Sequence, residues 1–138
     1  MVTSTRDVLV VDPDPDLVTL LDLLLTDAGY SVRTATSLED GARALRERAP
    51  HLVLADVRLP GSSPFALLTH LAGQETLRSL PVMLCTASID DLKEARRWRD
   101  RPYTAALLKP FEIEMLLHCM EKLLDGGSFG LDPYTADG

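Results

Sequence analysis

The stretch VLVVDPDPDLVTLL, residues 8–21, sets three aspartates between an apolar run and a leucine-rich run. The apolar, β-branched run before Asp12 is typical of a strand that is buried on both faces. After Asp14, apolar residues recur with the three- and four-residue spacing of one helix face, at Leu17, Leu20, Leu21, Leu24, Leu25 and Ala28. Because Gly29 is suited to end such a helix, the stretch predicts a strand, a short acidic turn and a helix.

The same order of strand and helix repeats along the chain. Apolar, strand-like runs occupy residues 7–12, 31–35, 51–56, 81–87 and 104–109. Stretches with helical periodicity occupy residues 17–28, 38–49, 65–73, 90–98 and 112–127. Strands that alternate with helices require right-handed crossovers and a parallel sheet that is covered on both faces. We therefore predict an α/β fold with a doubly wound, five-stranded parallel sheet.

Length and composition predict one compact domain. The chain has 138 residues, of which 46% are hydrophobic and 25% are charged, enough for one ordinary core. We expect this domain to span residues 1–125. Residues 126–138 are rich in glycine and polar side chains and too few to fold alone, so we expect a flexible C-terminal tail and a domain that stands alone.

Composition also excludes several classes of protein. The longest apolar runs are far shorter than the roughly 20 residues of a membrane span, and no signal peptide is evident, which favours a soluble cytoplasmic protein without a membrane partner. A net charge of -7 argues against binding to nucleic acid. Cys85 and Cys119 lie in separate apolar segments, so we expect reduced core thiols rather than a disulfide or a zinc site.

Chemically active side chains stand where four of the predicted strands end, at Asp12, Asp56, Thr86 and Lys109. In a doubly wound sheet, ligands bind beyond the carboxyl ends of the strands, at the point where the winding reverses. Two carboxylates can hold a hard cation through oxygen, while an ammonium and a hydroxyl can meet phosphoryl oxygens. The sequence therefore predicts a site for a phosphate group and a metal ion at this edge.

Four motifs in this order resemble the receiver domain of bacterial two-component response regulators. They are VLVVD with the acidic stretch that follows it, LVLADVRLPG, VMLCTAS and LLKPF, and the resemblance covers residues 7 to about 124. It implies a flavodoxin-like receiver fold with the strand order 2-1-3-4-5. It also implies a signalling protein rather than an enzyme, with a histidine kinase or histidine phosphotransfer protein as phosphodonor and a protein as downstream partner.

The resemblance assigns a role to each motif residue. Asp56 would accept the phosphoryl group, Lys109 would pair with Asp56 and later with the phosphate, and Thr86 would hydrogen-bond a phosphoryl oxygen. These roles agree with the chemistry, because a carboxylate attacks phosphorus only when nearby cations offset its repulsion from the phosphoryl oxygens. In this family the output and dimer surface is formed by the fourth helix, fifth strand and fifth helix, here residues 90–98, 104–109 and 112–127. This surface can present Arg96, Arg97, Arg99 and Glu114.

The resemblance also implies Mg²⁺, held by Asp12, Asp56 and the backbone carbonyl of Arg58. Receivers usually carry two adjacent acids after the first strand, but Pro13 takes the place of the second one here. Proline has no side-chain oxygen, so either Asp12 or Asp14 adjusts to fill the site, or metal binding and phosphorylation are weakened or lost.

A second departure concerns the aromatic switch residue that the family places three positions before the lysine. Ala106 stands there, and Tyr103 is not aligned with the switch position. The usual coupling, in which an aromatic ring swings inward as Thr86 engages the phosphate, therefore lacks a carrier. These departures keep open an alternative within the family, a receiver-like adaptor that acts without phosphorylation.

The three aspartates also fit patterns of other sites, namely a calcium loop, a phosphohydrolase and a helix cap. A calcium loop requires Gly and Glu at positions occupied by Leu17 and Leu23, so that interpretation fails. A phosphohydrolase of the haloacid dehalogenase type, with Asp12 as nucleophile and Asp14 as acid, is the enzyme alternative. Such an enzyme needs a second acidic pair after its lysine, but the pair Asp90–Asp91 precedes Lys109. A purely structural interpretation makes Asp14 the N-cap of the helix that starts with a proline, with Asp16 in its first turn.

Overall fold

Five parallel strands form one sheet in the computed structural model, which describes residues 5–126. The strands pair in the order β2-β1-β3-β4-β5, as predicted. Their bounds are β1 (Asp7–Val11), β2 (Ser31–Ala35), β3 (Leu52–Asp56), β4 (Val82–Thr86) and β5 (Thr104–Leu108). The winding reverses between β1 and β3, so the carboxyl ends of these two strands flank the switch point. The expected tail lies outside the described residues, apart from Gly126.

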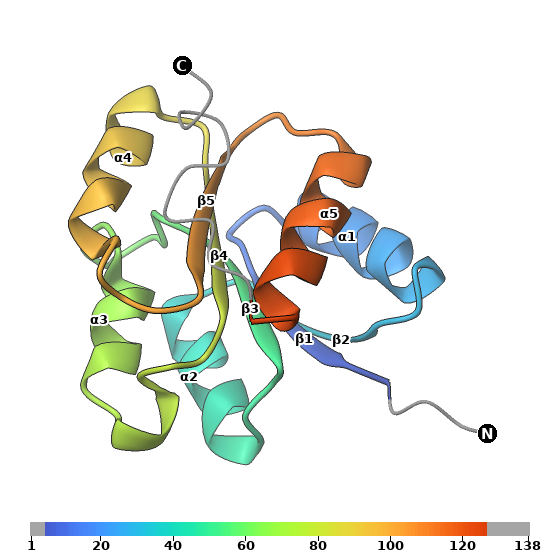
Figure 1. Cartoon of the computed structure of the whole chain (residues 1–138), viewed down its shortest axis with the longest axis horizontal. Coiled ribbons are helices and arrows are strands. Elements are labelled where there is room, and N and C mark those ends of the chain that lie inside the picture. The colour runs from blue at the N-terminus through green and yellow to red at the C-terminus, as the bar shows by residue number, and fades with distance from the viewer. Residues whose placement is uncertain (1–4, 127–138) are drawn as a thin grey trace.

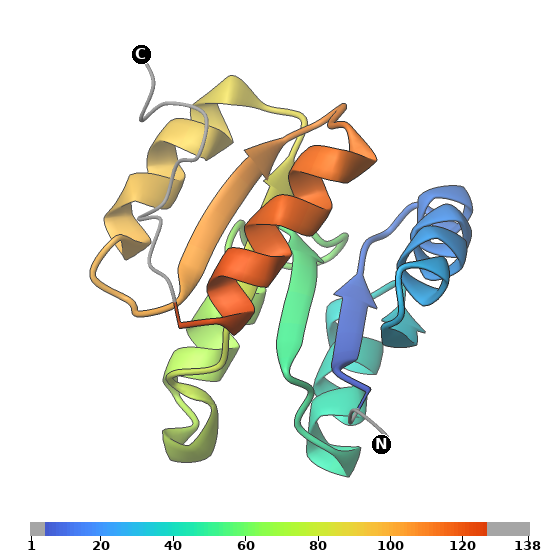
Figure 2. The same cartoon turned by 45° about the vertical axis from the view of Figure 1, so that its right-hand side comes forward.

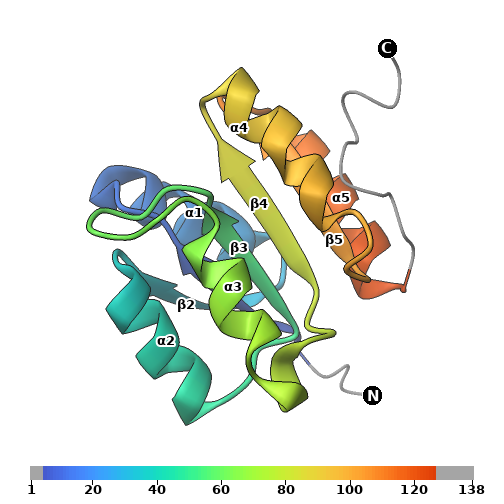
Figure 3. The same ribbon diagram turned by 90° about the vertical axis from the view of Figure 1, so that its left-hand side faces the viewer.

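Helices cover both faces of this sheet (Figure 1). Helices α1 and α5 lie on one face, while α2, α3 and α4 lie on the other, which is turned toward the viewer in Figure 3. The helices are α1 (Pro15–Asp27), α2 (Leu38–Glu47), α3 (Ala66–Ala72), α4 (Ile89–Glu94) and α5 (Ile113–Leu124), with 3₁₀ turns η1 (Glu75–Leu77) and η2 (Ala95–Trp98). None of the helices within residues 5–126 combines the length and the apolar character needed to cross a membrane.

The continuous apolar runs in the sequence arise because the central strands are buried on both faces. In β1, Val8 and Val10 pack into the core beneath α1 and α5, whereas Leu9 and Val11 pack into the core beneath α2, α3 and α4. Successive side chains of a strand point to opposite faces, so a strand between two helical layers needs apolar residues at every position.

Helix α1 begins and ends as its sequence predicts, but its core-facing side is different. Asp14 is the N-cap residue, and Gly29, with φ of 102°, follows the helix end in the left-handed region. The residues of α1 that are buried are Val18, Leu21 and Leu25, whereas Leu20 is 50% exposed and Leu23 is 66% exposed. Periodicity revealed an apolar stripe, but the positions of the sheet and α5 determine which part of this leucine-rich surface faces inward.

The helix predicted over residues 90–98 is split in the structure. Helix α4 ends at Glu94, and the chain continues as the 3₁₀ turn η2, which ends at Trp98. The ring of Trp98 stacks on Phe65, with centroids 6.4 Å apart and planes inclined by 29°. Ala95 is fully buried at the point where the helix type changes, so tertiary packing accompanies the tighter winding.

Candidate functional site

Asp12, Asp56 and Lys109 meet at the carboxyl edge of the sheet, as predicted. Asp12 follows β1, Asp56 ends β3, and Lys109 follows β5. The ammonium Nζ of Lys109 donates to Oδ2 of Asp12 at 2.6 Å and to Oδ2 of Asp56 at 3.0 Å. All three side chains are largely buried, so water screens these ion pairs less than it screens surface pairs. The edge therefore holds two carboxylates around one ammonium.

The environment of Lys109 favours its charged form. Burial by itself lowers the pKa of the ammonium, but the hydrogen bonds and charges of Asp12 and Asp56 outweigh it and raise the pKa above its ordinary value. Lys109 thus remains a cation throughout the physiological pH range. A fixed positive charge beside Asp56 is what an incoming phosphoryl group requires.

The three opening aspartates have different positions in the structure. Asp12 is almost fully buried, and its Oδ1 accepts a hydrogen bond from the backbone N–H of Asp14 at 2.9 Å. Asp14 caps α1, because its Oδ1 accepts from the N–H groups of Asp16 and Leu17 at 3.0 and 3.4 Å. Asp16 lies in the first turn of α1. Only Asp12 is directed at Lys109, and Asp14 has the capping role that the structural interpretation predicted.

The donor groups fit a magnesium ion in kind. Asp12 and Asp56 would supply carboxylate oxygens, and the carbonyl of Arg58 is the third ligand that the family resemblance implies, all hard ligands of the type that Mg²⁺ prefers. Within residues 5–126, however, no group of three His, Cys, Asp or Glu side chains is arranged to hold a metal ion. Pro13 stands where the resemblance places a second acid, and its side chain has no oxygen to offer.

Thr86 stands at the end of β4 and is almost fully buried. Its Oγ1 accepts a hydrogen bond from the backbone N–H of Ser88 at 3.0 Å, and its carbonyl accepts from the N–H of Lys109 at 2.7 Å. The hydroxyl proton of Thr86 is thereby left to donate in another direction. The structure brings Thr86 to the same edge as Lys109 but ties its hydroxyl to the start of α4.

An ion pair beside the site was missed by the sequence analysis. The guanidinium of Arg58 donates to both carboxylate oxygens of Asp91, from Nε at 2.6 Å and from Nη2 at 3.0 Å. From the sequence, only the backbone carbonyl of Arg58 had an expected role, and Asp91 fell at the start of the helix predicted over residues 90–98. Asp91 does lie in the first turn of α4, but it is buried. A separation of 33 residues left no local pattern from which this pair could be inferred.

The residues around β5 lack an aromatic group at the switch position. Ala106 is fully buried in the middle of the strand. Tyr103 precedes β5, at the opposite end of the strand from Lys109, and packs with the core beneath α1 and α5. This arrangement agrees with the sequence prediction that neither residue provides a ring beside Thr86.

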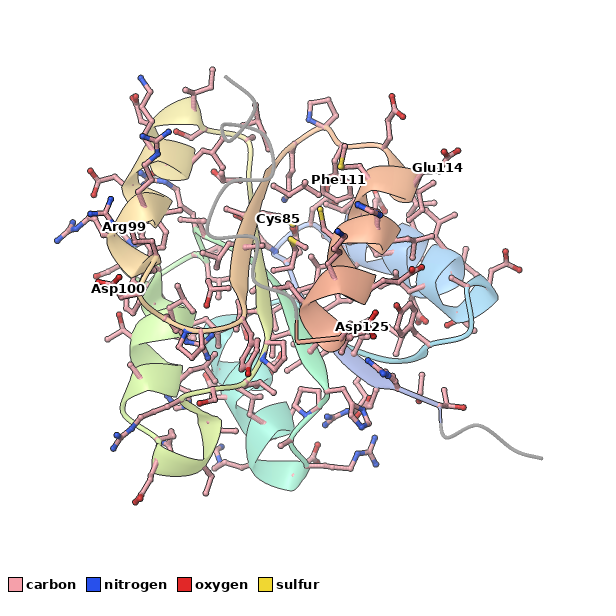
Figure 4. All side chains as sticks on the ribbon, viewed as in Figure 1. Cys85, Arg99, Asp100, Phe111, Glu114 and Asp125 are labelled. Atoms are coloured by element: carbon pink, nitrogen blue, oxygen red, sulfur yellow. The ribbon has the colours of Figure 1, made fainter. Side chains whose placement is uncertain are left out.

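Both cysteines are free thiols in the core. Cys85 lies on β4 beneath α5 (Figure 4), and Cys119 packs into the same core from α5. Burial raises the pKa of both thiols, most strongly that of Cys85. Their predicted place in the core is therefore confirmed, and neither has the character of a nucleophile.

An apolar groove of about 430 Å³ opens beside Lys109, between α1 and the start of α5. These helices occupy the same face of the sheet (Figure 2), and Phe111 lies at the N-terminal end of α5 (Figure 4). Leu20, one of the two exposed leucines of α1, lines this groove, whereas Leu23 does not. The groove is lined by Leu17, Leu20, Leu21, Leu24, Ala87, Lys109, Pro110, Phe111 and Ile113.

Two aspartates and a lysine thus meet at the carboxyl edge of a doubly wound sheet, beside the switch point where α/β domains of this class bind their ligands. Residues 8–121 match the family described as the response regulator receiver domain, so the chain belongs to that family of two-component signalling modules. Family membership also removes the dehalogenase-type alternative, in which Asp12 would be the nucleophile of an enzyme.

Several known proteins are similar to this chain. The transcriptional regulatory protein AfsQ1 of Streptomyces coelicolor is 39% identical over 84 residues, which are 61% of this chain and 36% of that protein. The transcriptional regulatory protein ZraR of Salmonella typhimurium is 32% identical over 124 residues, which are 90% of this chain and 27% of that protein. The chain thus spans only 36% of the length of the first relative and 27% of the length of the second.

A solved structure has the same fold over nearly its full length. It is a putative response regulator from Chloroflexus aurantiacus, with a TM-score of 0.79 and 27% sequence identity. The match covers 88% of this chain and 99% of that one.

Proposed function

We propose that this protein accepts a phosphoryl group on Asp56 from a histidine kinase or a histidine phosphotransfer protein, and that it signals through protein contacts. The observation that carries the proposal is the ammonium of Lys109, which bridges Asp12 and Asp56 at the switch point of the sheet. Family membership supports the same role.

The proposed transfer is a displacement at phosphorus. A carboxylate oxygen of Asp56 forms a bond to phosphorus while the bond from phosphorus to the donor's imidazole nitrogen breaks, and the imidazole keeps the electron pair. Lys109 offsets the negative charge of the phosphoryl oxygens, and the Thr86 hydroxyl donates to one of them. A Mg²⁺ ion held by Asp12, Asp56 and the Arg58 carbonyl would supply further positive charge at the same place.

The groove beside Lys109 suits the approach of a phosphodonor protein. It is apolar, it opens next to the acceptor edge, and it is bordered by leucines of α1 and by Phe111 and Ile113. An apolar surface of this kind binds an amphipathic helix of a partner. We assign the groove to the helix that carries the donor histidine.

Intact-mass measurement after treatment with acetyl phosphate and Mg²⁺ tests this function without a cognate kinase. The wild type should gain the mass of one phosphoryl group, and Asp56→Asn should gain none. Asp90→Asn, which alters an exposed acid of α4, is the matched control and should be labelled like the wild type.

The second candidate is an adaptor that acts without phosphorylation, and Pro13 and Ala106 favour it. In that case acetyl phosphate should not label the folded wild type, and a phosphoryl mimic should not bind to it. A label that persists in Asp56→Asn would instead contradict the assignment of the acceptor.

A further inference from the structure

Asp91 is a buried carboxylate whose charge is paired with a residue of another segment. It lies in the first turn of α4, only 4% exposed, and Arg58 engages both of its oxygens. The guanidinium of Arg58 is itself 66% exposed. Removing a buried carboxylate from its partner costs far more than breaking an exposed pair such as that of Arg97 and Glu94. Asp91 and Arg58 should therefore move together.

Two hydrogen-bonded routes lead from the acceptor edge to this ion pair. In the first, the backbone N–H of Arg58 donates to Oδ1 of Asp56 at 3.1 Å, and the Arg58 guanidinium continues to Asp91. In the second, Oγ1 of Thr86 accepts from the N–H of Ser88 at 3.0 Å, and Oγ of Ser88 accepts from the N–H of Asp91 at 3.2 Å. Both routes end in the first turn of α4.

We propose that Arg58, through its ion pair with Asp91, transmits the state of Asp56 to α4 and replaces the aromatic switch that Ala106 lacks. This inference rests on the proposed function, since a phosphoryl group on Asp56 supplies the change of state. Phosphorylation converts the Asp56 carboxylate to an acyl phosphate and so alters the acceptor of the Arg58 N–H, and the backbone of Arg58 shifts. The buried Asp91 then follows its guanidinium, and α4 is displaced with it.

Trp98 provides an intrinsic reporter of this displacement. It is the single tryptophan of the chain, and it lies in η2, which continues α4 directly. Its ring stacks on Phe65, which precedes α3 in the segment that also carries Arg58. A movement of α4 relative to this segment should therefore change the emission of Trp98.

The test measures bound fluoride and Trp98 emission together. Beryllium fluoride with Mg²⁺ serves as the phosphoryl mimic, and fluorine NMR detects the complex on Asp56. The variants are Asp91→Leu, which removes the ion pair without leaving a buried charge, and Asp91→Asn, which preserves the shape of the side chain. Asp90→Asn alters an exposed acid of the same turn and is the matched control.

The proposal expects bound fluoride in all four proteins. Trp98 emission should change on binding in the wild type and in Asp90→Asn, and this change should be lost in Asp91→Leu and reduced in Asp91→Asn. A full response in Asp91→Leu would overturn the proposal, as would a wild type that binds fluoride with constant emission.

A wild type that binds no fluoride would contradict the proposed phosphoacceptor function, and a ligand-free measurement then decides the further inference. Asp56→Ala removes the acceptor of the Arg58 N–H, so the exchange rates of the α4 backbone amides should change. In the Asp91→Leu background the same substitution should leave these rates unaltered. Equal effects of Asp56→Ala in the two backgrounds would refute coupling through Arg58 and Asp91.

Discussion

Lys109 and Asp12 form an ion pair of 2.6 Å although 97 residues separate them in the sequence. The distance from the same ammonium to Asp56 is longer, at 3.0 Å. Lys109 is thus shared between two carboxylates and lies closer to the one that is not the proposed acceptor. With Pro13 in place of a second acid, Asp12 is the carboxylate directly after β1 that this lysine and a metal ion would share.

Substitution of Lys109 should reduce stability in a pH-dependent way. Lys109→Met leaves Asp12 and Asp56 close together without a counter-charge, which should lower the free energy of unfolding by about 2 kcal/mol at neutral pH. The pKa of Lys109 is raised above 10.5 in the folded state, so its contribution is complete below that pH and is lost as the pH rises through the folded value. Urea unfolding from pH 7 to 11 should therefore show a constant deficit that shrinks above about pH 10.5.

The exposed Lys93 provides the control for this experiment. Lys93→Met should change the free energy of unfolding by only a few tenths of a kcal/mol. A deficit of Lys109→Met that stays constant up to pH 11 would show that the two carboxylates do not hold the lysine in its charged form.

Replacement of Pro13 should strengthen metal binding. Pro13→Asp restores the missing acid, so the variant should gain more thermal stability from Mg²⁺ than the wild type does. In chelator the variant should melt below the wild type, because three acids then repel one another. Thermal melts with and without Mg²⁺ measure both effects, and Gln74→Glu adds a charge at an exposed position as the control. An equal gain in wild type and variant would show that Pro13 does not limit the metal site.

Removal of the helix cap separates the two roles considered for Asp14. Asp14→Ala deprives the N–H groups of Asp16 and Leu17 of their acceptor, which should lower the free energy of unfolding by about 1 kcal/mol. Asp16→Ala removes a first-turn charge and should cost less. If Asp14 is only a cap, its substitution leaves Mg²⁺ affinity unchanged in calorimetric titration. A clear loss of affinity would instead make Asp14 a ligand that compensates for Pro13.

The surface formed by α4, β5 and α5 is the expected site of output and of homodimer formation. It is turned toward the viewer in Figure 4, with Arg99 on its α4 side and Glu114 on its α5 side. Reversing charge with Arg96→Glu and Arg97→Glu together should weaken any dimer that beryllium fluoride induces, as measured by sedimentation velocity. Arg43→Glu on α2 is the control. Unchanged association in the double variant would place the output surface elsewhere.

The sequence by itself determined the fold and the location of the candidate site. Continuous apolar runs identified strands buried on both faces, and helical periodicity identified the helices between them, because both patterns depend on local geometry. The strand ends then predicted that Asp12, Asp56 and Lys109 would meet, since parallel strands bring their carboxyl ends to one edge. The cap at Asp14 was equally local and was predicted from the aspartate that precedes Pro15.

Only the tertiary structure decided which side of α1 faces the core and where the buried charges find partners. The inward direction of α1 depends on the sheet and α5, so Val18 is buried while Leu20 borders a groove. The pairing of Arg58 with Asp91 joins segments that are distant in sequence, and α4 changes to a 3₁₀ turn where Trp98 meets Phe65. Such contacts depend on how separate elements pack, and this information is absent from the periodicity of any single element.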